Sequence, residues 1–295
     1  QREFSSKFRE HINQAQLFYN SMSEAEKLHM KKAFSFELDH CDDPIVYERL
    51  AGHRLAEIDL DLARKVSEMV GAPIPDKALR PNHGNRAYHL SQMDFMPQTP
   101  TIETRRIAII IGDGYDPVAF SGMRTAIKAA GALPFIIGTK RSPIFAEGEN
   151  PSSSPGITPD HQHDGQRSTL FDATFIPGGP HVKTLAANGQ IRYWIIETFA
   201  HLKALGATGE AVDLVRASLA TGTALDIKVA GPNDTEPVEW YGVVTSGGKQ
   251  SPSGFREGAK ILKGAKDFVG QFFYQISQHR NFRRELDGLN SAVAY

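Results

Sequence analysis

The sequence predicts an α/β fold: a mostly parallel sheet with helices on both faces, preceded by a helical segment. The unbroken apolar run at residues 107–111, which stops at Gly112, is typical of a strand covered on both faces. Residues 118–130 then carry apolar side chains at helical spacing and end at Gly131, before a second apolar run at 133–137. Strand, glycine turn, helix and strand form a βαβ unit, so the sheet is parallel and its crossover right-handed.

Composition sets the limits on class and partners. With 295 residues, 40% of them hydrophobic and 23% charged, the chain is long enough for about two packed domains. A net charge of −1 and a pI near 6.9 give no general attraction to nucleic acid, and no apolar run approaches the length of a membrane span. The single cysteine, Cys41, excludes an intrachain disulfide and a cysteine metal cage. Because Gln1 follows no start methionine or signal peptide, we expect the chain to be cut from a longer protein.

Residues 1–71 read as a helical segment. Ser23 and Glu26 have the spacing of a capping box, and the helix that follows places Leu28, Met30, Ala33, Phe34 and Leu38 near one face. Asp43-Pro44 starts a second helix that we expect to end at Gly52. Asp59 caps a third, at 60–70, which Gly71 ends. On periodicity alone, a generic helical packing module explains these features.

Residues 72–104 are rich in proline, which fixes φ and removes amide donors, so we expect an extended connector between two domains. We expect apolar side chains to pin it to a surface: Tyr88, Met93, Phe95 and Met96.

The α/β domain occupies residues 105–295. Further strands are expected at 173–176, at 204–207 and within a β-rich run at 238–244. A loop at 139–168, with a Ser-Ser-Ser-Pro-Gly stretch, is expected to be exposed. Helices are expected at four places: 181–187, 191–203, 210–220 and a long C-terminal stretch, 257–279.

Three glycine turns follow predicted strands: Gly112-Asp-Gly114, Pro177-Gly-Gly-Pro180 and Gly206-Ala-Thr-Gly209. Open α/β sheets bind ligands at this edge, although tight turns alone also explain the glycines. The first turn lacks the third glycine of a dinucleotide fingerprint, and Gly248-Lys249-Gln250 lacks the hydroxyl of a phosphate loop.

Other candidate sites have simpler explanations. His161-Gln-His163 has the spacing of half a metal site, but solvated loop histidines are commoner. Asp113 and Asp116 could pair for acid–base chemistry or simply serve a turn. The basic residues at 279–284 have acidic neighbours, which favours a solvated helix end over a nucleic-acid footprint. Asn233-Asp-Thr235 matches the N-glycosylation pattern, which matters only in a secreted protein.

Most of residues 13–71 resembles, in one register, the C-terminal helical segment of haem catalases. The resemblance rests on Ser21-Met-Ser-Glu-Ala-Glu-Lys27, Lys32-Ala-Phe-Ser-Phe-Glu-Leu38 and Asp43-Pro-Ile-Val-Tyr-Glu-Arg49. In that family the segment packs outside the haem-binding barrel and supplies none of the haem chemistry, so Tyr19 and Tyr47 are not expected to be haem ligands.

The strand order, Pro177-Gly-Gly179 and Leu205-Gly-Ala-Thr-Gly-Glu210 resemble the type 1 glutamine-amidotransferase-like superfamily, which implies a doubly wound, flavodoxin-like sheet. Catalytic members carry a cysteine on a strained elbow. The matching position here is Ala207, whose methyl group cannot attack a carbonyl, and the Thr208 hydroxyl is offset and weak without a base. Ala207, Thr208 and Gly209 are therefore interpreted as a vestigial elbow without a nucleophile.

Helices, tether and amidotransferase-like domain, in this order, resemble the C-terminal half of large-subunit, especially fungal, catalases. The resemblance implies a parent that disproportionates hydrogen peroxide at a haem, and a chain that holds no catalytic residue, cofactor or metal. Its expected partners are the catalase core of the parent and further copies in a homotetramer. The compartment stays open between cytoplasm and secretion, since the sequence from Ser291 to Tyr295 is not a peroxisomal address.

Two functions are weighed for the chain itself. In the first it stabilises the enzyme and lengthens the channel to the haem. In the second it is a holdase chaperone for unfolded client proteins, by similarity to heat-shock members of the superfamily and through an exposed apolar face with Phe34, Phe36 and Leu38. A cysteine hydrolase or glyoxalase is disfavoured by Ala207 and by the position of Cys41 outside the α/β domain.

Overall fold

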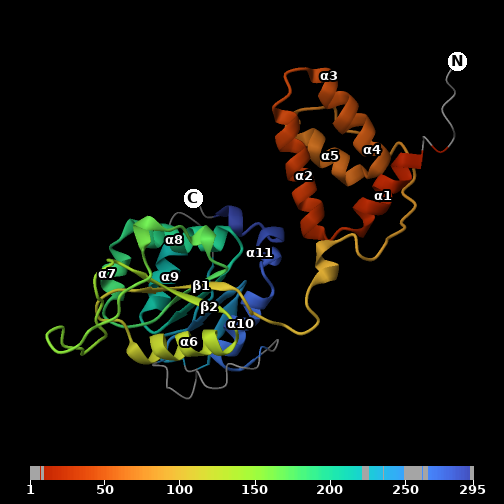
Figure 1. Ribbon diagram of the computed structural model, residues 1–295. Helices are drawn as coiled ribbons and strands as arrows, with labels where there is room; N and C mark the ends of the chain where they lie inside the picture. The colour runs from red at the N-terminus through yellow and green to blue at the C-terminus, as the bar shows by residue number, and fades with distance from the viewer. Residues whose placement is uncertain are drawn as a thin grey trace. The chain divides into compact units, whose positions relative to one another are not determined.

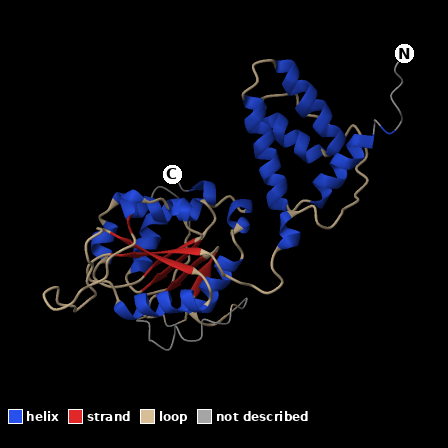
Figure 2. Cartoon of the chain, in the orientation of Figure 1, coloured by secondary structure: helices blue, strands red, loops and turns tan. Residues whose placement is uncertain are grey.

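The computed structural model describes residues 7, 10–220, 226–234, 236–248, 261 and 265–292. The chain divides into two compact units, Gln1–Met96 and Pro97–Tyr295. The first unit is helical, and the second is built on a sheet (Figures 1 and 2).

The helical unit begins with α1 (His11–Ser21) and α2 (Glu24–Asp39) and ends with α5 (Leu60–Val70). Local signals start α2 and α5 and end α5 as predicted. Ser23 and Glu26 form a capping box on α2, Asp59 caps α5 through the Leu62 amide, and Gly71 ends α5 with φ +72°. Most buried apolar side chains of the unit form one cluster: Tyr19, Leu38, Ala51, Leu55, Ala56, Leu62, Ala63, Val66 and Ala72.

The helix that starts at Asp43 does not end at Gly52, as the sequence predicts. It runs from α3 (Pro44–Tyr47) through a π-helical stretch, η2 (Glu48–Arg54), into α4 (Leu55–Ile58). Gly52 lies inside the π-helical stretch, so the helix continues through it and it does not act as a C-cap.

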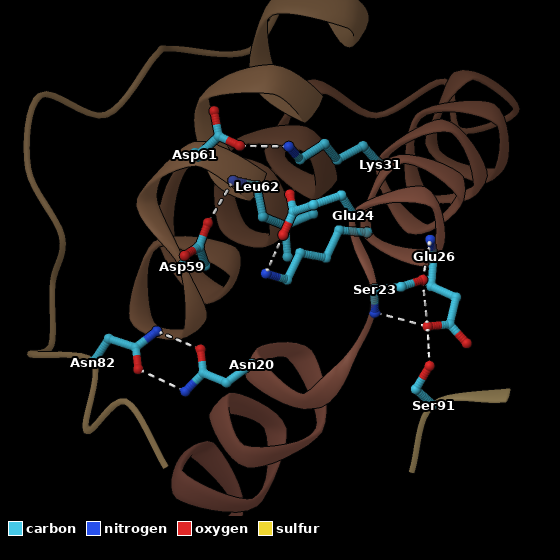
Figure 3. Close-up of polar contacts among 11 residues, drawn as sticks. Asn20, Ser23, Glu24, Glu26, Lys31, Asp59, Asp61, Leu62, Asn82 and Ser91 are labelled. Carbon is cyan, nitrogen blue, oxygen red and sulfur yellow. Dashed lines mark hydrogen bonds and ion pairs between the residues drawn. The ribbon is translucent and has the colours of Figure 1, made fainter. Parts of the chain in front are cut away.

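The connector that follows α5 has one short 3₁₀ segment, η3 (Gln92–Phe95), and up to Met96 it belongs to the helical unit. Polar contacts hold it: the side chains of Asn20 and Asn82 donate to each other at 2.8 and 2.9 Å, and the Ser91 hydroxyl donates to Glu26 at 2.7 Å (Figure 3). The prediction that apolar side chains pin it is wrong for three of the four, since these are exposed to solvent: Tyr88, Met93 and Phe95.

The second unit contains a seven-stranded sheet of order β3-β2-β1-β4-β5-β7-β6, parallel except for the β6–β7 pair. It confirms the predicted fold class, an α/β sheet preceded by helices and consistent with a flavodoxin-like fold. The strands are β1 (Arg106–Ile111), β2 (Leu133–Gly138), β3 (His161–Gln162), β4 (Ala173–Ile176), β5 (Ala204–Thr208), β6 (Val238–Trp240) and β7 (Val243–Ser246).

Two features of the sheet depart from the prediction. The β-rich run at 238–244 is two antiparallel strands, because the backbone reverses at Tyr241 and Gly242, with φ +49° and +82°. The expected loop at 139–168 contains β3, which pairs with β2 at the edge of the sheet.

Helices cover both faces of the sheet, because side chains alternate along β1. Ile107, Ile109 and Ile111 pack with α6 (Pro117–Ala129) and α10 (Phe268–Ser277). Ala108 and Ile110 face the opposite cluster, which contains α7 (Val182–Ala186), α8 (Gly189–Ala200) and α9 (Ala211–Ala220). After α10 comes the short α11 (Phe282–Leu286).

The long C-terminal helix predicted at 257–279 is shorter in the structure. Asp267 caps α10, its carboxylate accepting from the Gly270 amide at 2.7 Å, and residues 261 and 265–267 are not helical. The rest of the predicted N-terminal part, 257–260 and 262–264, lies outside the described residues.

Candidate functional site

The three glycine turns meet at the carboxyl edge of the sheet. Their strands β1, β4 and β5 are parallel neighbours, so their ends lie side by side. The Asp116 amide donates to the Gly178 carbonyl at 2.8 Å, and the Gly178 amide donates to the Thr208 hydroxyl at 3.3 Å. A Cβ at Gly179, where φ is +115°, would lie 2.5 Å from the Gly114 carbonyl oxygen. Only glycine fits there, because the first two turns pack backbone on backbone.

His181, which was not among the candidate site residues, connects the first two of these turns. The side chain is 1% exposed. Its Nδ1 accepts from the Gly112 amide at 3.1 Å, and Nε2 lies 2.9 and 3.0 Å from the carbonyl oxygens of Pro177 and Gly178. Burial lowers the pKa of His181, and the two carbonyls oppose the shift only in part. A neutral ring with its proton on Nε2 makes hydrogen bonds at both nitrogens. The histidine therefore has a structural role, and neither nitrogen is available as a base.

The proposed vestigial elbow lies at the end of β5. Ala207 is a fully buried strand residue, paired with Ile176 on one side and Thr245 on the other. Thr208 is 1% exposed and ends the strand. The left-handed φ at this turn, +55°, falls on Gly209. Ala207 thus points its methyl group into the apolar cluster on one face of the sheet.

Beside this turn lies an open cavity of about 490 Å³. Its polar lining is acidic, with Asp116, Glu147, Glu210 and Asp213, and backbone from the glycine turns completes it. Two of these carboxylates accept hydrogen bonds from the backbone: Asp116 caps α6, and Glu210 accepts from the Gly179 amide at 2.7 Å. Among the described lining residues no nucleophile lies beside a base, so the cavity presents acceptors for a polar ligand and no machinery for acyl transfer.

Asp113 and Asp116 do not form a carboxylate pair. Asp113 accepts from the Lys140 ammonium at 2.6 Å and from the Phe145 amide at 3.0 Å, whereas Asp116 caps its own helix. Asn233 lines the acidic cavity, but Thr235 of its glycosylation pattern lies outside the described residues, as do Lys249 and Gln250.

Two predictions of solvated side chains are wrong. His163 is 6% exposed, because the Asn188 amide that caps α8 also donates to its Nε2 at 2.8 Å. Arg284, assigned to a solvated basic cluster, is fully buried. Its Nη1 donates to the Phe199 carbonyl at 2.6 Å, and its guanidinium lies 4.0 Å from the Phe199 ring centroid. Neither contact has a local sequence signal.

The helical unit has a different kind of surface, an apolar groove of about 430 Å³ beside α2. The predicted apolar face of α2 is only partly covered: Leu38 is buried, Met30 and Phe34 are half-buried, and Ala33 is exposed. These side chains line the groove together with Glu37, Cys41, Val46 and Leu50.

Tyr19 and Tyr47 of the helical unit are protonated phenols. Burial raises the pKa of Tyr19, with Asp59 and Asp61 adding to the shift. The pKa of Tyr47 is also raised, and its hydroxyl donates to the Cys41 carbonyl. The described residues contain no group of three or more histidine, cysteine or carboxylate side chains placed to hold a metal ion. Nor do they contain a helix with the length and apolarity needed to cross a membrane.

Comparison with known proteins places these features in a family. The family described as "Catalase-related immune-responsive" matches residues 5–70. The whole chain is 76% identical over 294 residues to Catalase A of Aspergillus fumigatus and 67% identical to Catalase A of Emericella nidulans. It is 52% identical over 292 residues to Catalase-1 of Neurospora crassa.

The chain corresponds to a C-terminal portion of large catalases. It spans only 38 to 39% of the length of these three relatives.

Proposed function

We propose that this chain is the non-haem C-terminal portion of a protein that disproportionates hydrogen peroxide to water and oxygen at a haem, and that it supports the enzyme without catalysing the reaction. The observation that carries this is the match of nearly the whole chain to proteins named catalase that are much longer. Consistent with a supporting role, Ala207 is buried in the apolar cluster and offers no nucleophile, and the buried His181 is fully engaged.

Two measurements test this proposal. The purified 295-residue chain is expected to show no haem absorption band and no peroxide decomposition. The full-length protein is expected to show both, and removal of the α/β unit is expected to lower its temperature of inactivation while peroxide turnover stays measurable. Haem bound by the isolated chain, or equal heat resistance with and without the α/β unit, would contradict the proposal.

The apolar groove beside α2 supports a docking role for the helical unit. It offers Met30 and Phe34 to a partner surface, and burial of such side chains stabilises an interface by roughly 25 cal/mol per Å². The partner that we propose is the catalase core of the same parent, and the supported assembly is a homotetramer.

Two phenylalanines of α2 form a matched pair for testing this contact. Phe34 lines the groove, whereas Phe36 is 64% exposed and is not among its lining residues. In the full-length protein, Phe34→Ser is expected to lower the inactivation temperature and Phe36→Ser to leave it nearly unchanged. Equal effects of the two substitutions would remove the groove from the proposed contact.

The same groove favours a second candidate, a holdase chaperone, because an apolar surface left open binds other apolar surfaces. Light scattering of a heat-denatured client distinguishes the two. If the chain is a holdase, it suppresses aggregation, and Phe34→Ser weakens that suppression. Unchanged aggregation in the presence of the chain removes this candidate.

A further inference from the structure

Charged side chains gather at the amino-terminal edge of the sheet, opposite the glycine turns. Arg105, Asp172 and Lys203 directly precede the neighbouring parallel strands β1, β4 and β5, so the three lie in a row. The single carboxylate of the row is already engaged. Asp172 Oδ1 accepts from Arg105 Nη1 at 3.2 Å, and Oδ2 accepts from the Arg106 amide at 2.8 Å.

Lys203 is a cation held out of solvent, with its side chain 2% exposed and its ammonium donating to the Ser168 carbonyl at 2.9 Å. Burial lowers its pKa to about 8, and the positive charge of Arg280 adds to the shift. Glu197, one of two carboxylates that oppose the shift, is itself engaged by the amide and hydroxyl of Ser168 at 3.2 and 2.5 Å.

Arg280, which follows α10, is half-buried, and few of its N–H donors have a hydrogen-bond acceptor. Within the described ranges its guanidinium makes one hydrogen bond, from Nη1 to the carbonyl of the adjacent His279 at 3.1 Å. No carboxylate in the described part of the chain forms an ion pair with it. Burial lowers the pKa of Arg280, and Arg105 lowers it further against the attraction of Asp172. The unused N–H donors of this guanidinium are available to an anion, whose charge would offset that of the neighbouring cations.

Helix ends bring the segments of this cluster together. Leu202 and His279, with φ of +60° and +64°, are the left-handed residues that follow the C-caps of α8 and α10, and Thr104, with φ of +64°, lies shortly before β1. Polar contacts join these segments. The Asn281 amide donates to the Leu202 carbonyl at 2.8 Å, and Arg105 Nη1 lies 3.1 Å from His279 Nδ1. These contacts hold Arg280 in the same place as Arg105 and Lys203.

We propose that Arg280, with Arg105 and Lys203 beside it, binds a small oxyanion of the phosphate class at the amino-terminal edge of the sheet. The planar guanidinium offers two parallel N–H donors that match an oxyanion. A bound anion also neutralises the repulsion between Arg280 and its cationic neighbours. The site is separate from the glycine turns and independent of the proposed docking groove.

Calorimetric titration of the 295-residue chain with inorganic phosphate, at an ionic strength held constant with chloride, tests the proposal. Wild type is expected to bind phosphate, and Arg280→Gln to bind it about tenfold more weakly or worse, since a charge-assisted hydrogen bond contributes roughly 1.5–3 kcal/mol. The matched control is Arg283→Gln, because Arg283 is 81% exposed and lies close by in sequence. It is expected to bind phosphate as wild type does.

Circular dichroism shows whether Arg280→Gln is folded. If it is not folded, the Arg280→Lys variant is tested instead, because it keeps the positive charge but loses the bidentate N–H donor. Weaker phosphate binding by Arg280→Lys than by wild type supports the proposal. Absence of phosphate binding by wild type, or an affinity in the folded Arg280 variant equal to that of wild type, overturns it. Sulfate in place of phosphate is expected to compete for the site.

Discussion

Buried polar side chains connect separate elements of the α/β unit through hydrogen bonds. His181 joins the turns after β1 and β4, and Arg284 joins α11 to the end of α8 and to the turn between β6 and β7. Arg284 Nε donates to the Tyr241 carbonyl at 3.0 Å, and Nη1 donates to the Phe199 carbonyl at 2.6 Å. These carbonyls are kept from water, so each needs its donor.

Arg284→Met is expected to destabilise the α/β unit by about 3 kcal/mol, because it leaves buried carbonyl groups without donors. Urea unfolding measures the change. The exposed neighbour supplies the control: Arg283→Met is expected to change stability by no more than about 0.5 kcal/mol. A small effect of Arg284→Met would mean that water replaces the lost donors.

Lys203 gives the unit a distinctive pH dependence. Its pKa is about 8 in the folded state against an ordinary value of 10.5, so between these values only the unfolded chain keeps the proton. Stability therefore rises with pH across this window, by at most about 1.4 kcal/mol per pH unit, and below it the burial penalty is fully present. Urea midpoints at pH 7, 9 and 10 should show this rise in wild type and not in Lys203→Met. The same rise in both would assign the dependence to another group.

At the scale of elements, one carboxylate connects a helix start to the distant connector. Glu26 accepts from the Ser23 amide at 2.8 Å, from the Ser91 hydroxyl at 2.7 Å and from the Gln92 amide at 2.9 Å. Burial alone would raise the pKa of Glu26, but these hydrogen bonds outweigh it and lower the pKa. The capping box of α2 is thus also the attachment point of the connector (Figure 3).

Glu26→Ala is expected to release the connector, so that limited proteolysis cuts at residues 87–92 faster than in wild type. Because the pKa of Glu26 is lowered on folding, its contribution is present above the ordinary value of 4.5 and is lost as pH falls through the folded value. Glu24→Ala serves as the control, since Glu24 pairs with Lys27 on the helix surface and does not contact the connector. Equal cleavage of the two variants would contradict the assignment.

At the scale of the molecule, the division into two compact units predicts two unfolding events. Phe272 is fully buried between α10 and the sheet, where a Cβ on Gly206 would lie 3.0 Å from its ring. Phe272→Ala is expected to cost about 3–5 kcal/mol and to shift only the calorimetric transition of the α/β unit. A single transition that moves as a whole would show that the units unfold together.

The sequence predicted best what is decided locally. Caps at Ser23, Asp43 and Asp59 and the stop at Gly71 were readable, because each acts on amides or carbonyls within a few residues. The buried run of β1 was readable because both of its faces are covered and its residues are therefore apolar throughout.

What was missed depends on contacts between distant residues. Gly52 looked like a helix stop, but the helix continues through it as a π-helical stretch that packs on α5. The burial of His163 depends on Asn188, and that of Arg284 on carbonyl groups more than 40 residues away. At the candidate crevice, the sequence indicated that the three glycine turns would lie at one edge of the sheet. No sequence pattern identifies His181, the residue that connects the turns after β1 and β4.

The outermost strands of the sheet are very short: β3 has two residues and β6 has three. Edge strands this short offer too few free amide and carbonyl groups for a strand of another polypeptide to pair with them and extend the sheet. Copies of this unit crowded together should therefore resist fusing into one continuous β-structure. Any association between them must rely on side chains that face outward from helices and loops.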